Sequence, residues 1–530
     1  MTVVKKFYSD YFKTADENSL KTEYIDQSID REKKLPKISK WDKFNILNAF
    51  NWYPSHYSLY ERKFLLKFDV CILFFLSFSF YTKYLDNSNV GTAYVSGLKE
   101  DLNLHGNELN YITTCYTVGY AAFQIPTTLL IAKPQLARPL LLFCELAWGL
   151  MTLANAYVTN VQQMYVIRFF IGVFEASSFP VAYVIFSSYL TPEELFKRSG
   201  FYGACSAAGV ASAGILQTTA MKHLDGVNGL SGWRWQYIID AILTFGIFLY
   251  GFFLFPGVPT TCKKFYPFTE DDMIFARKRL ENRVSIPRKW TLATLKETLT
   301  TWQFYLCSLL WVLHHKVWYS NGDILYMKSL PELFPKTAVT TWDSYINTVA
   351  VPSCLIVPPL CAYYGSFLTT NLTFVISYYS AIILIIWEVP RNVMLSSFFL
   401  QGLFGYGLAQ LFFTWFSVLC RDNTEKKALV LSFAQAASYA VNAFSTPLQF
   451  NMKHSPKFRS GYIANLIIII CAHLLYFIIM FLEKYDMRYL PRFAGKRYEF
   501  DSIAELKTDE VSVEISSKQD ALEIVKTISA

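Results

Sequence analysis

The chain has 530 residues, of which 53% are hydrophobic, 17% aromatic and only 17% charged, and its formal net charge is +8. A soluble domain usually carries about 25% charged residues, so this composition excludes an ordinary soluble protein, a disordered chain, a coiled coil and a secreted disulfide scaffold. Because both ends are polar, the apolar residues must form long segments in the middle, which is typical of a polytopic membrane protein.

The basic residues do not form one patch, which argues against nucleic acid as a partner. Lys and Arg gather in the two tails and in alternate loops, a pattern that predicts cytosolic termini. One loop dissents, because Lys453, Lys457 and Arg459 fall on the outside. The ten cysteines are scattered, without the spacing of a metal site or of a disulfide framework.

Apolar runs predict an all-α integral membrane protein with twelve transmembrane helices. They cover roughly residues 66–86, 109–131, 139–157, 161–187, 199–221, 235–256, 302–325, 342–364, 368–388, 393–417, 428–451 and 461–482. The predicted regions are a cytosolic tail (1–64), a six-helix half (65–256), a basic cytosolic linker (257–301), a second six-helix half (302–482) and a cytosolic tail (483–530). Two six-helix halves joined in this way are the layout of the major facilitator fold, whose substrate site lies between the halves near the midplane.

The first predicted span runs into the sequence Tyr84-Leu-Asp86-Asn87-Ser-Asn89-Val-Gly. Asn and Gly favour turns, and the side chain of Lys83 could reach the lipid headgroups. The residues alone therefore slightly favour an interfacial loop here.

The fourth span contains Arg168 and, seven positions later, Glu175. At about 100° per residue both side chains lie on one face, but they are about 10 Å apart along the axis, too far for a simple direct pair. A face with a fixed cation and an acid that can take up a proton suits proton-coupled transport of an anion. The alternative is a charge network that only holds helices together, and we favour the transport role.

The seventh span contains His314, His315, Lys316, Asn321 and Asp323. Lys316 and Asp323 again stand seven apart and share a face, so Lys316 could meet a substrate carboxylate from the second half. The alternative is a later start of the span, with His314 to Lys316 at the headgroups or against a neighbouring helix. Adjacent histidines on a helix point about 100° apart, so no metal site is predicted.

Several amides in other spans could hydrogen-bond a polar ligand, although such amides more often join helices together. They are Gln124 in the second span, Gln410 in the tenth and Asn442 in the eleventh. The sequence has no phosphate-binding glycine loop with a lysine, no nucleophile elbow and no metal-ligand cluster. We therefore expect a transporter without a cofactor, driven by an ion gradient, and not an enzyme.

Three elements carry a family likeness: the segment from Tyr84 to Asp101, the face from Arg168 to Glu175, and Gly229-Leu-Ser-Gly-Trp-Arg-Trp235 followed by Asp240. Together they resemble the fungal allantoate permease family, in the anion:cation symporter group of the major facilitator superfamily. The likeness covers roughly residues 60–485 and is nearest to the biotin and pantothenate permeases.

The resemblance implies proton-driven uptake of a small organic anion at the fungal plasma membrane. It implies that Asp86 lies inside the first helix, that Asp86 and Glu175 take part in proton coupling, and that Arg168 balances these acids. Many relatives have an arginine where this chain has Asn87. A carboxylate substrate then needs another cation, and Lys316 or Lys83 is the candidate.

We expect a monomeric symporter that contacts lipid, protons and a vitamin-like monocarboxylate, pantothenate or biotin. The candidate substrate-binding residues are Asn87, Asn89, Gln124, Lys316, Asn321, Asp323, Gln410 and Asn442. The alternatives are another cargo (allantoate, nicotinate, a dipeptide or a sulfur-containing organic acid) or a non-transporting nutrient sensor on the same fold. A sensor would be expected to have a long signalling tail, and residues 483–530 offer only a modest one.

Overall fold

The computed structural model describes part of the chain. The described residues are 49–54, 57–281, 292–317, 322–330, 332–333, 342, 345–346, 348–420, 423–450 and 457–489. The chain divides into two units, Met1–Lys484 and Tyr485–Ala530, and the bundle of helices belongs to the first. Most of both predicted tails lies outside the described residues, as does Asn321.

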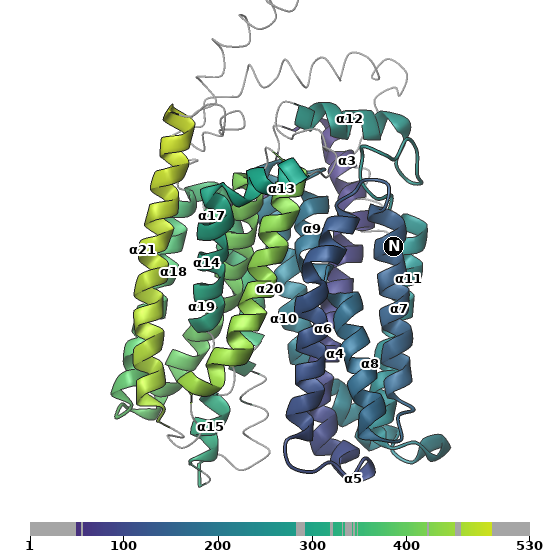
Figure 1. The fold of residues 1–530 in the computed structure, drawn as a ribbon, viewed down its shortest axis with the longest axis vertical. Helices are drawn as coiled ribbons and strands as arrows, with labels where there is room; N and C mark the ends of the chain where they lie inside the picture. The colour runs from purple at the N-terminus through teal and green to yellow at the C-terminus, as the bar shows by residue number, and fades with distance from the viewer. Residues whose placement is uncertain are drawn as a thin grey trace, which may run out of the picture. The chain divides into compact units, whose positions relative to one another are not determined.

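The described residues form helices and connecting loops, without a β-sheet (Figure 1). Up to the predicted linker, the helices are α3 (Leu59–Phe68), η4 (Asp69–Leu73), α4 (Phe74–Ala93), η5 (Tyr94–Leu98), α5 (Lys99–Asp101), α6 (Glu108–Ile131), α7 (Ala137–Asn155), α8 (Val161–Glu175), α9 (Ser178–Phe186), α10 (Pro192–His223), η6 (Val227–Gly229) and α11 (Gly232–Leu254). They are followed by α12 (Glu270–Glu281), α13 (Leu292–Leu299), α14 (Trp302–Val317), α15 (Gly322–Lys328), α17 (Ala350–Tyr364), α18 (Ser366–Ile386), α19 (Arg391–Leu419), α20 (Thr424–Gln449) and α21 (Arg459–Tyr489).

Helices lie in each of the twelve ranges predicted to span the membrane. Among the described residues, eight helical segments are long and apolar enough to cross a bilayer. They are Leu59–Ala93, Ala137–Asn155, Val161–Phe186, Gly232–Leu254, Ser366–Ile386, Arg391–Leu419, Thr424–Thr446 and Arg459–Tyr485. Helices α6 and α10 are long but carry many Thr, Ser, Gly and amide residues, whereas α14 and α17 are short. The predicted all-helical fold class is confirmed.

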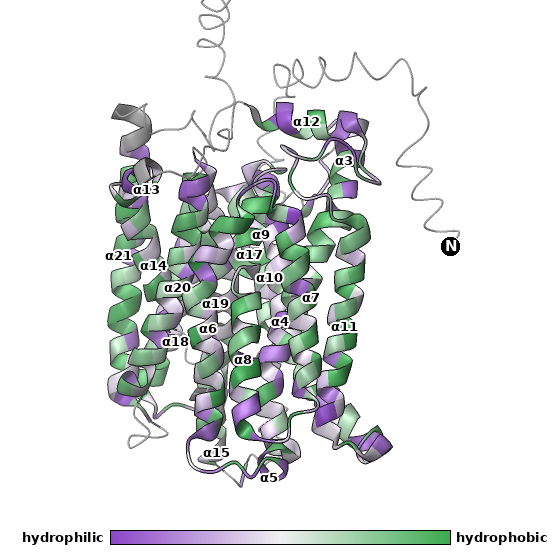
Figure 2. Ribbon diagram, turned by 45° about the vertical axis from the view of Figure 1, so that its right-hand side comes forward, coloured by the Kyte–Doolittle hydropathy of each residue, from purple (hydrophilic) through white to green (hydrophobic). Residues whose placement is uncertain are grey.

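Apolar residues predominate along the helices, as the hydropathy colouring shows (Figure 2), and many of the large ones are exposed. Large apolar residues are strongly exposed on α11, α18 and α21, for example Ile242 (62%), Val375 (62%) and Phe481 (68%). Polar and charged side chains are instead buried between the helices, among them Lys83 and Asp86. An apolar exterior around a polar interior is what a lipid-facing bundle requires.

The six helices of the first half pack closely because glycines remove side chains at their crossings. Gly209 of α10 lies against α4, where a Cβ atom would come 2.4 Å from the carbonyl oxygen of Tyr81. Gly172 of α8 lies against α6, with 2.3 Å to the carbonyl oxygen of Tyr116. A larger residue at either glycine would separate these helices, two of which carry buried charged side chains: Lys83 and Asp86 on α4, and Arg168 and Glu175 on α8.

The two halves pack against each other at the end of the bundle near α12 and α13. There Ser199 of α10 bonds Thr414 of α19 (2.8 Å between the two Oγ-type atoms), and the ammonium of Lys427 in α20 donates to Ser187 (2.8 Å). Gly200 lies so close to α17 that a Cβ atom would be 2.4 Å from the carbonyl oxygen of Cys354. We call this set of contacts the closed end.

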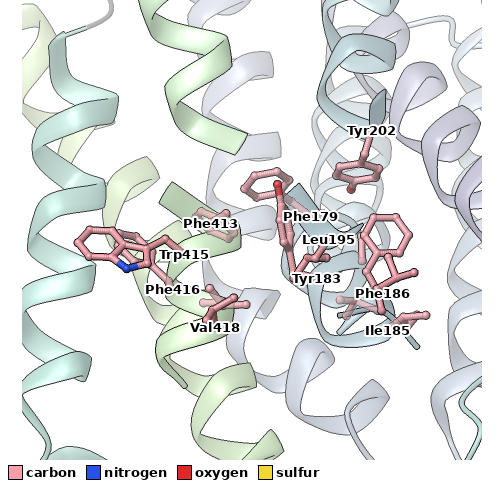
Figure 3. Packing of buried hydrophobic residues seen from close by; sticks show 14 of the residues in the cluster. Phe179, Tyr183, Ile185, Phe186, Leu195, Tyr202, Phe413, Trp415, Phe416 and Val418 are labelled. Carbon is pink, nitrogen blue, oxygen red and sulfur yellow. The ribbon is translucent and has the colours of Figure 1, made fainter. Parts of the chain in front are cut away.

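An aromatic cluster fills the space just inside the closed end (Figure 3). Phe179 of α9 lies 4.3 Å from Phe413 of α19 between ring centroids, and Trp311 of α14 lies 4.2 Å from the same ring. Tyr183 donates its hydroxyl to the side-chain oxygen of Gln410 (2.6 Å). These side chains come from both halves, so any opening at this end must separate them.

The described part of the predicted linker forms two short helices, α12 and α13. Arg279 of α12 pairs with Glu61 of α3 (2.9 Å between Nη2 and Oε1) and with Glu194 at the start of α10. Asp272, also on α12, accepts from Lys67 (2.6 Å) and from the hydroxyl of Tyr60 (2.8 Å). Helix α12 is therefore held to the first half by ion pairs.

Candidate functional site

Asp86 lies inside a helix and not in a loop. Helix α4 continues through Asn87 and Asn89 to Ala93, and the side chain of Asp86 is fully buried. The loop interpretation drawn from the turn-forming residues is therefore wrong, as is the end of the first span at residue 86. The side chain of Asn89 makes buried hydrogen bonds to α11, and such tertiary contacts outweigh a local preference for turns.

Arg168 of α8 is the cation that faces Asp86. Its Nη1 atom lies 3.2 Å from Oδ2 of Asp86, and its Nη2 atom donates to the hydroxyl of Tyr237 on α11 (2.9 Å). Both members of the ion pair are buried. Burial of a single charge is costly, so this pairing allows both groups to remain ionised inside the bundle.

Glu175 is buried two turns from Arg168 and has a different partner. Tyr116 of α6 donates its hydroxyl to Oε2 of Glu175 (2.7 Å), and the amide of Asn87 donates to the hydroxyl of Tyr116 (2.8 Å). The helical period correctly predicted one buried face with no direct pair between Arg168 and Glu175. Asn87 thus reaches Glu175 through one tyrosine.

Lys83 is a second buried cation, one turn before Asn87 on α4. Its ammonium donates to the hydroxyl of Tyr120 (2.8 Å) and to Oγ of Ser178 (3.0 Å), and it lies 4.1 Å from the centroid of the Tyr120 ring. Across the described ranges, no carboxylate lies within ion-pair distance of this ammonium. Lys83 therefore points into the bundle and does not reach toward headgroups.

The second half meets this charged cluster through an aromatic contact. The rings of Tyr120 and of Tyr439, on α20, have centroids 4.6 Å apart. His315 of α14 stacks on Tyr439 at 5.6 Å, and its ring also contacts the amide of Asn442. Asn442, a sequence-predicted position, and His315 therefore lie close to the half-to-half interface.

Lys316 does not join the charged cluster. Its ammonium donates to Thr446 of α20 (2.8 Å) and lines a groove of about 460 Å³ between α14, α20 and α21. Adjacent residues on a helix point about 100° apart, so His315 and Lys316 face different neighbours. Asp323 is buried on α15, and the residues between α14 and α15 lie outside the described ranges. The shared face of Lys316 and Asp323 stays a prediction.

The two predicted glutamines have different surroundings. Gln410 belongs to the closed end, where it accepts from Tyr183. Gln124 is fully buried on the face of α6 that carries Tyr116 and Tyr120, and within the described part of the chain its amide has no hydrogen-bond partner. An unsatisfied buried amide is unusual in a folded protein and is consistent with a position that a polar ligand would reach.

Sequence reasoning does not select the tyrosines of this site or a role for Asp240. Tyr116, Tyr120, Gln124 and Thr128 follow one another at four-residue intervals, about one turn each, so a polar face of α6 is present in the sequence. Asp240 is fully buried on α11 and accepts from the amide of Asn89 (3.0 Å). In the sequence it stands out only by its place beside the Gly-Trp-Arg-Trp motif.

A buried set of acids, cations and amides inside the first half of a helical bundle with an apolar exterior is typical of a membrane transporter. Residues 73–446 match the Major Facilitator Superfamily, so the chain belongs to this family of transporters. It is 34% identical to the pantothenate transporter liz1 of Schizosaccharomyces pombe over 77% of this chain and 80% of that protein. It is 32% identical to the pantothenate transporter FEN2 of Saccharomyces cerevisiae, over 76% and 80%.

A further relative, a vitamin H transporter of Saccharomyces cerevisiae, is 27% identical over 85% of this chain and 77% of that protein. Among solved structures, the proton:xylose symporter XylE matches 77% of this chain and 95% of its own with a TM-score of 0.57 and 12% identity. The E. coli fucose:proton symporter FucP matches 77% and 99% with a TM-score of 0.56 and 12% identity. These structures confirm the major facilitator fold. The chain is a transporter and not an enzyme.

Proposed function

We propose that this protein is a plasma-membrane symporter that couples proton entry to the uptake of a small monocarboxylate, pantothenate or biotin. The observation that carries the proposal is Lys83, a buried ammonium without a carboxylate partner among the described residues, beside Tyr120 at the interface of the halves. A substrate carboxylate would supply the missing anion. The similarity to two pantothenate transporters and a vitamin H transporter supports this cargo.

The charges of the first half support proton coupling. The buried cluster contains two cations, Lys83 and Arg168, and three acids, Asp86, Glu175 and Asp240. If all five were ionised, the cluster would carry a net negative charge and would repel an arriving carboxylate. Protonation of Glu175 removes one negative charge next to Lys83, so a proton and an anion are best accommodated together.

The closed end supports a transport cycle by alternating access. In our topology both termini are cytosolic, so the closed end faces the cytosol and substrate enters from the other side. Binding at Lys83 draws the halves together around Tyr439. Separation of the closed end then releases the anion and the proton to the cytosol, and the chain performs this cycle as a monomer.

The proposal is tested by uptake into yeast that lacks its own permeases for these compounds. Labelled pantothenate, biotin, nicotinate, allantoate and a dipeptide are supplied with and without a protonophore. We expect pantothenate or biotin to accumulate, and the protonophore to abolish accumulation. Accumulation that is insensitive to the protonophore would refute proton coupling, and uptake of another compound would refute the cargo. No uptake of any compound by protein at the cell surface would favour a sensor.

A further inference from the structure

Asp240 is a third buried acid whose surroundings differ from those of Asp86 and Glu175. Its Oδ2 atom accepts from the amide nitrogen of Asn89 (3.0 Å), and its Oδ1 atom has no hydrogen-bond partner in the parts of the chain that the structure describes. No cation lies within ion-pair distance of it in those parts. A buried carboxylate without a cation is strongly disfavoured, so Asp240 holds a proton in this arrangement.

The amide of Asn89 is fixed by a second contact. Its side-chain oxygen accepts from the amide nitrogen of Gln236 (2.5 Å), which leaves its own nitrogen to donate to Asp240. Thr92 also contacts the amide of Gln236 (3.1 Å). This network holds Asp240 in place without neutralising it.

Arg168 lies between Asp86 and the helix that carries Asp240. Asp86 and Asn89 are three residues apart on α4, and Tyr237 and Asp240 are three residues apart on α11, so each pair occupies one face of its helix. The guanidinium of Arg168 bonds Asp86 with one nitrogen and Tyr237 with another. It therefore already reaches α11 one turn from Asp240.

We propose that Asp240 is the alternative carboxyl partner of Arg168, so that Arg168 alternates between Asp86 and Asp240 while the two acids share one proton. In the arrangement described, Asp86 is ionised and paired, and Asp240 carries the proton. In the other, the O–H bond of Asp240 breaks, a proton is bound by Asp86, and the guanidinium moves to the new carboxylate. Charge is conserved in both, and the inference rests on the proposed proton coupling.

Other charged groups around Asp240 fit this exchange. Glu175 on α8 is a further acid that acts on Asp240 electrostatically, and α4 also carries the buried Lys83. On α7, which also packs against α11, Glu145 is occupied by a hydrogen bond from Ser79 (2.7 Å), two turns of α4 away from Asp86. Helix α10, which also packs against α11, carries the buried neutral amide of Gln217. Arg168 is thus the cation that already contacts α11, through Tyr237, one turn from Asp240.

The first test is a double-mutant cycle on the thermal stability of the full-length protein purified in detergent. We expect Asp86→Asn to be tolerated, because Arg168 then pairs with Asp240. We expect Asp86→Asn with Asp240→Asn to lower the melting temperature by clearly more than the sum of the two single variants. Adding Arg168→Gln should restore stability, and this triple variant covers a double variant that fails to fold. Additive single effects, or no rescue by Arg168→Gln, would overturn the proposal.

The second test measures proton-driven accumulation by Asp240→Asn, which can still accept a hydrogen bond from Asn89 but cannot be ionised and so cannot form an ion pair with Arg168. We expect at least a ~10-fold lower accumulation ratio than that of the matched variant Thr244→Val, one turn further along α11. Accumulation by Asp240→Asn equal to that of Thr244→Val would overturn the exchange. If the wild type itself shows no protonophore-sensitive accumulation, the proposed function fails, and the stability cycle still decides the pairing of Arg168.

Discussion

Tyr120 of the first half and Tyr439 of the second lie with ring centroids 4.6 Å apart and ring planes inclined by 45°. The hydroxyl of Tyr120 also accepts from the ammonium of Lys83, so the contact between the halves is one side chain away from the buried cation. A ligand carboxylate that binds Lys83 therefore lies next to a residue that moves with the other half. In the proposed cycle, this relationship would connect substrate binding to the movement of the halves.

Substitution of Lys83 should weaken binding of the acid selectively. We expect Lys83→Gln to raise the KM for the monocarboxylate at least ~10-fold, in line with the ~1.4 kcal/mol that a tenfold change in affinity represents. The uncharged primary amide of the same compound should inhibit uptake by Lys83→Gln and by the wild type with nearly the same inhibition constant. The exposed Lys99→Gln serves as the control. Equal loss of acid and amide binding in Lys83→Gln would mean that Lys83 only supports the fold.

Glu175→Gln keeps a side chain that can accept from Tyr116 but cannot be ionised. We expect the variant to lose concentrative uptake and its dependence on external pH. Exchange of internal for external substrate, which needs no net proton movement, should continue. The measurement compares net uptake and exchange in vesicles with an imposed pH gradient, with the exposed Glu100→Gln as a control. Normal accumulation by Glu175→Gln would remove this residue from the coupling step.

The closed end should be trapped by a cross-link between the halves. The hydroxyl oxygens of Ser199 and Thr414 are 2.8 Å apart, so cysteines at both positions should form a disulfide when oxidised. We expect oxidation to abolish uptake by the double variant and a reductant to restore it. Uptake by each single cysteine variant, in a background without Cys205 and Cys354, should not change on oxidation. Uptake by the fully cross-linked protein would show that this end does not open during transport.

The ion pairs of α12 should stabilise the folded protein in a pH-dependent way. Burial acts to raise the pKa of Glu194, but the guanidinium groups of Arg279 and Arg198 outweigh it, and the pKa lies below its usual value of 4.5. A lowered pKa contributes stability that is complete above 4.5 and is lost as the pH falls through the folded-state value. We expect Glu194→Gln to be less stable than the wild type at pH 7.

Melting temperatures of the purified wild type and of Glu194→Gln, measured between pH 3 and pH 8, test this stabilisation. The difference between the two proteins should be constant at neutral pH and should shrink in acid. Arg279→Gln should destabilise the protein more than Glu194→Gln does. We expect it to lower the free energy of unfolding by roughly 3 kcal/mol, because it leaves both Glu61 and Glu194 without this cation. A difference between wild type and Glu194→Gln that grows in acid would contradict the assignment.

The fold could be predicted from the sequence because each long apolar run has to be a helix in a bilayer. The placement of Arg168 and Glu175 on one buried face followed from the helical period alone. The position of Asp86 inside a helix could not be derived in this way, because Asn87 and Asn89 favour turns. Only their hydrogen-bond partners on other helices keep α4 helical here. Resemblance to a family placed Asp86 correctly where local preference failed.

The sequence narrowed the candidate cation for a substrate carboxylate to Lys316 or Lys83, but it could not decide between them. A helical period tells which residues share a face, but it does not tell which neighbour that face meets. Lys316 therefore looked equivalent to Lys83 in the sequence, whereas in the structure it turns to Thr446 and Lys83 turns to Tyr120. Sequence reasoning did not select Tyr116 and Tyr120, because an aromatic residue in a membrane helix usually packs against its neighbours without a functional role.

The location of the charged cluster has a consequence for the evolution of cargo preference. The five ionisable groups from Lys83 to Asp240 all belong to α4, α8 and α11 of the first half, whereas the second half presents Tyr439 and His315. If the charged cluster performs the proposed proton coupling, the first half can stay unchanged while substitutions in the second half alter the cargo. Laboratory selection for a different acid should accordingly collect its substitutions on α14 and α20.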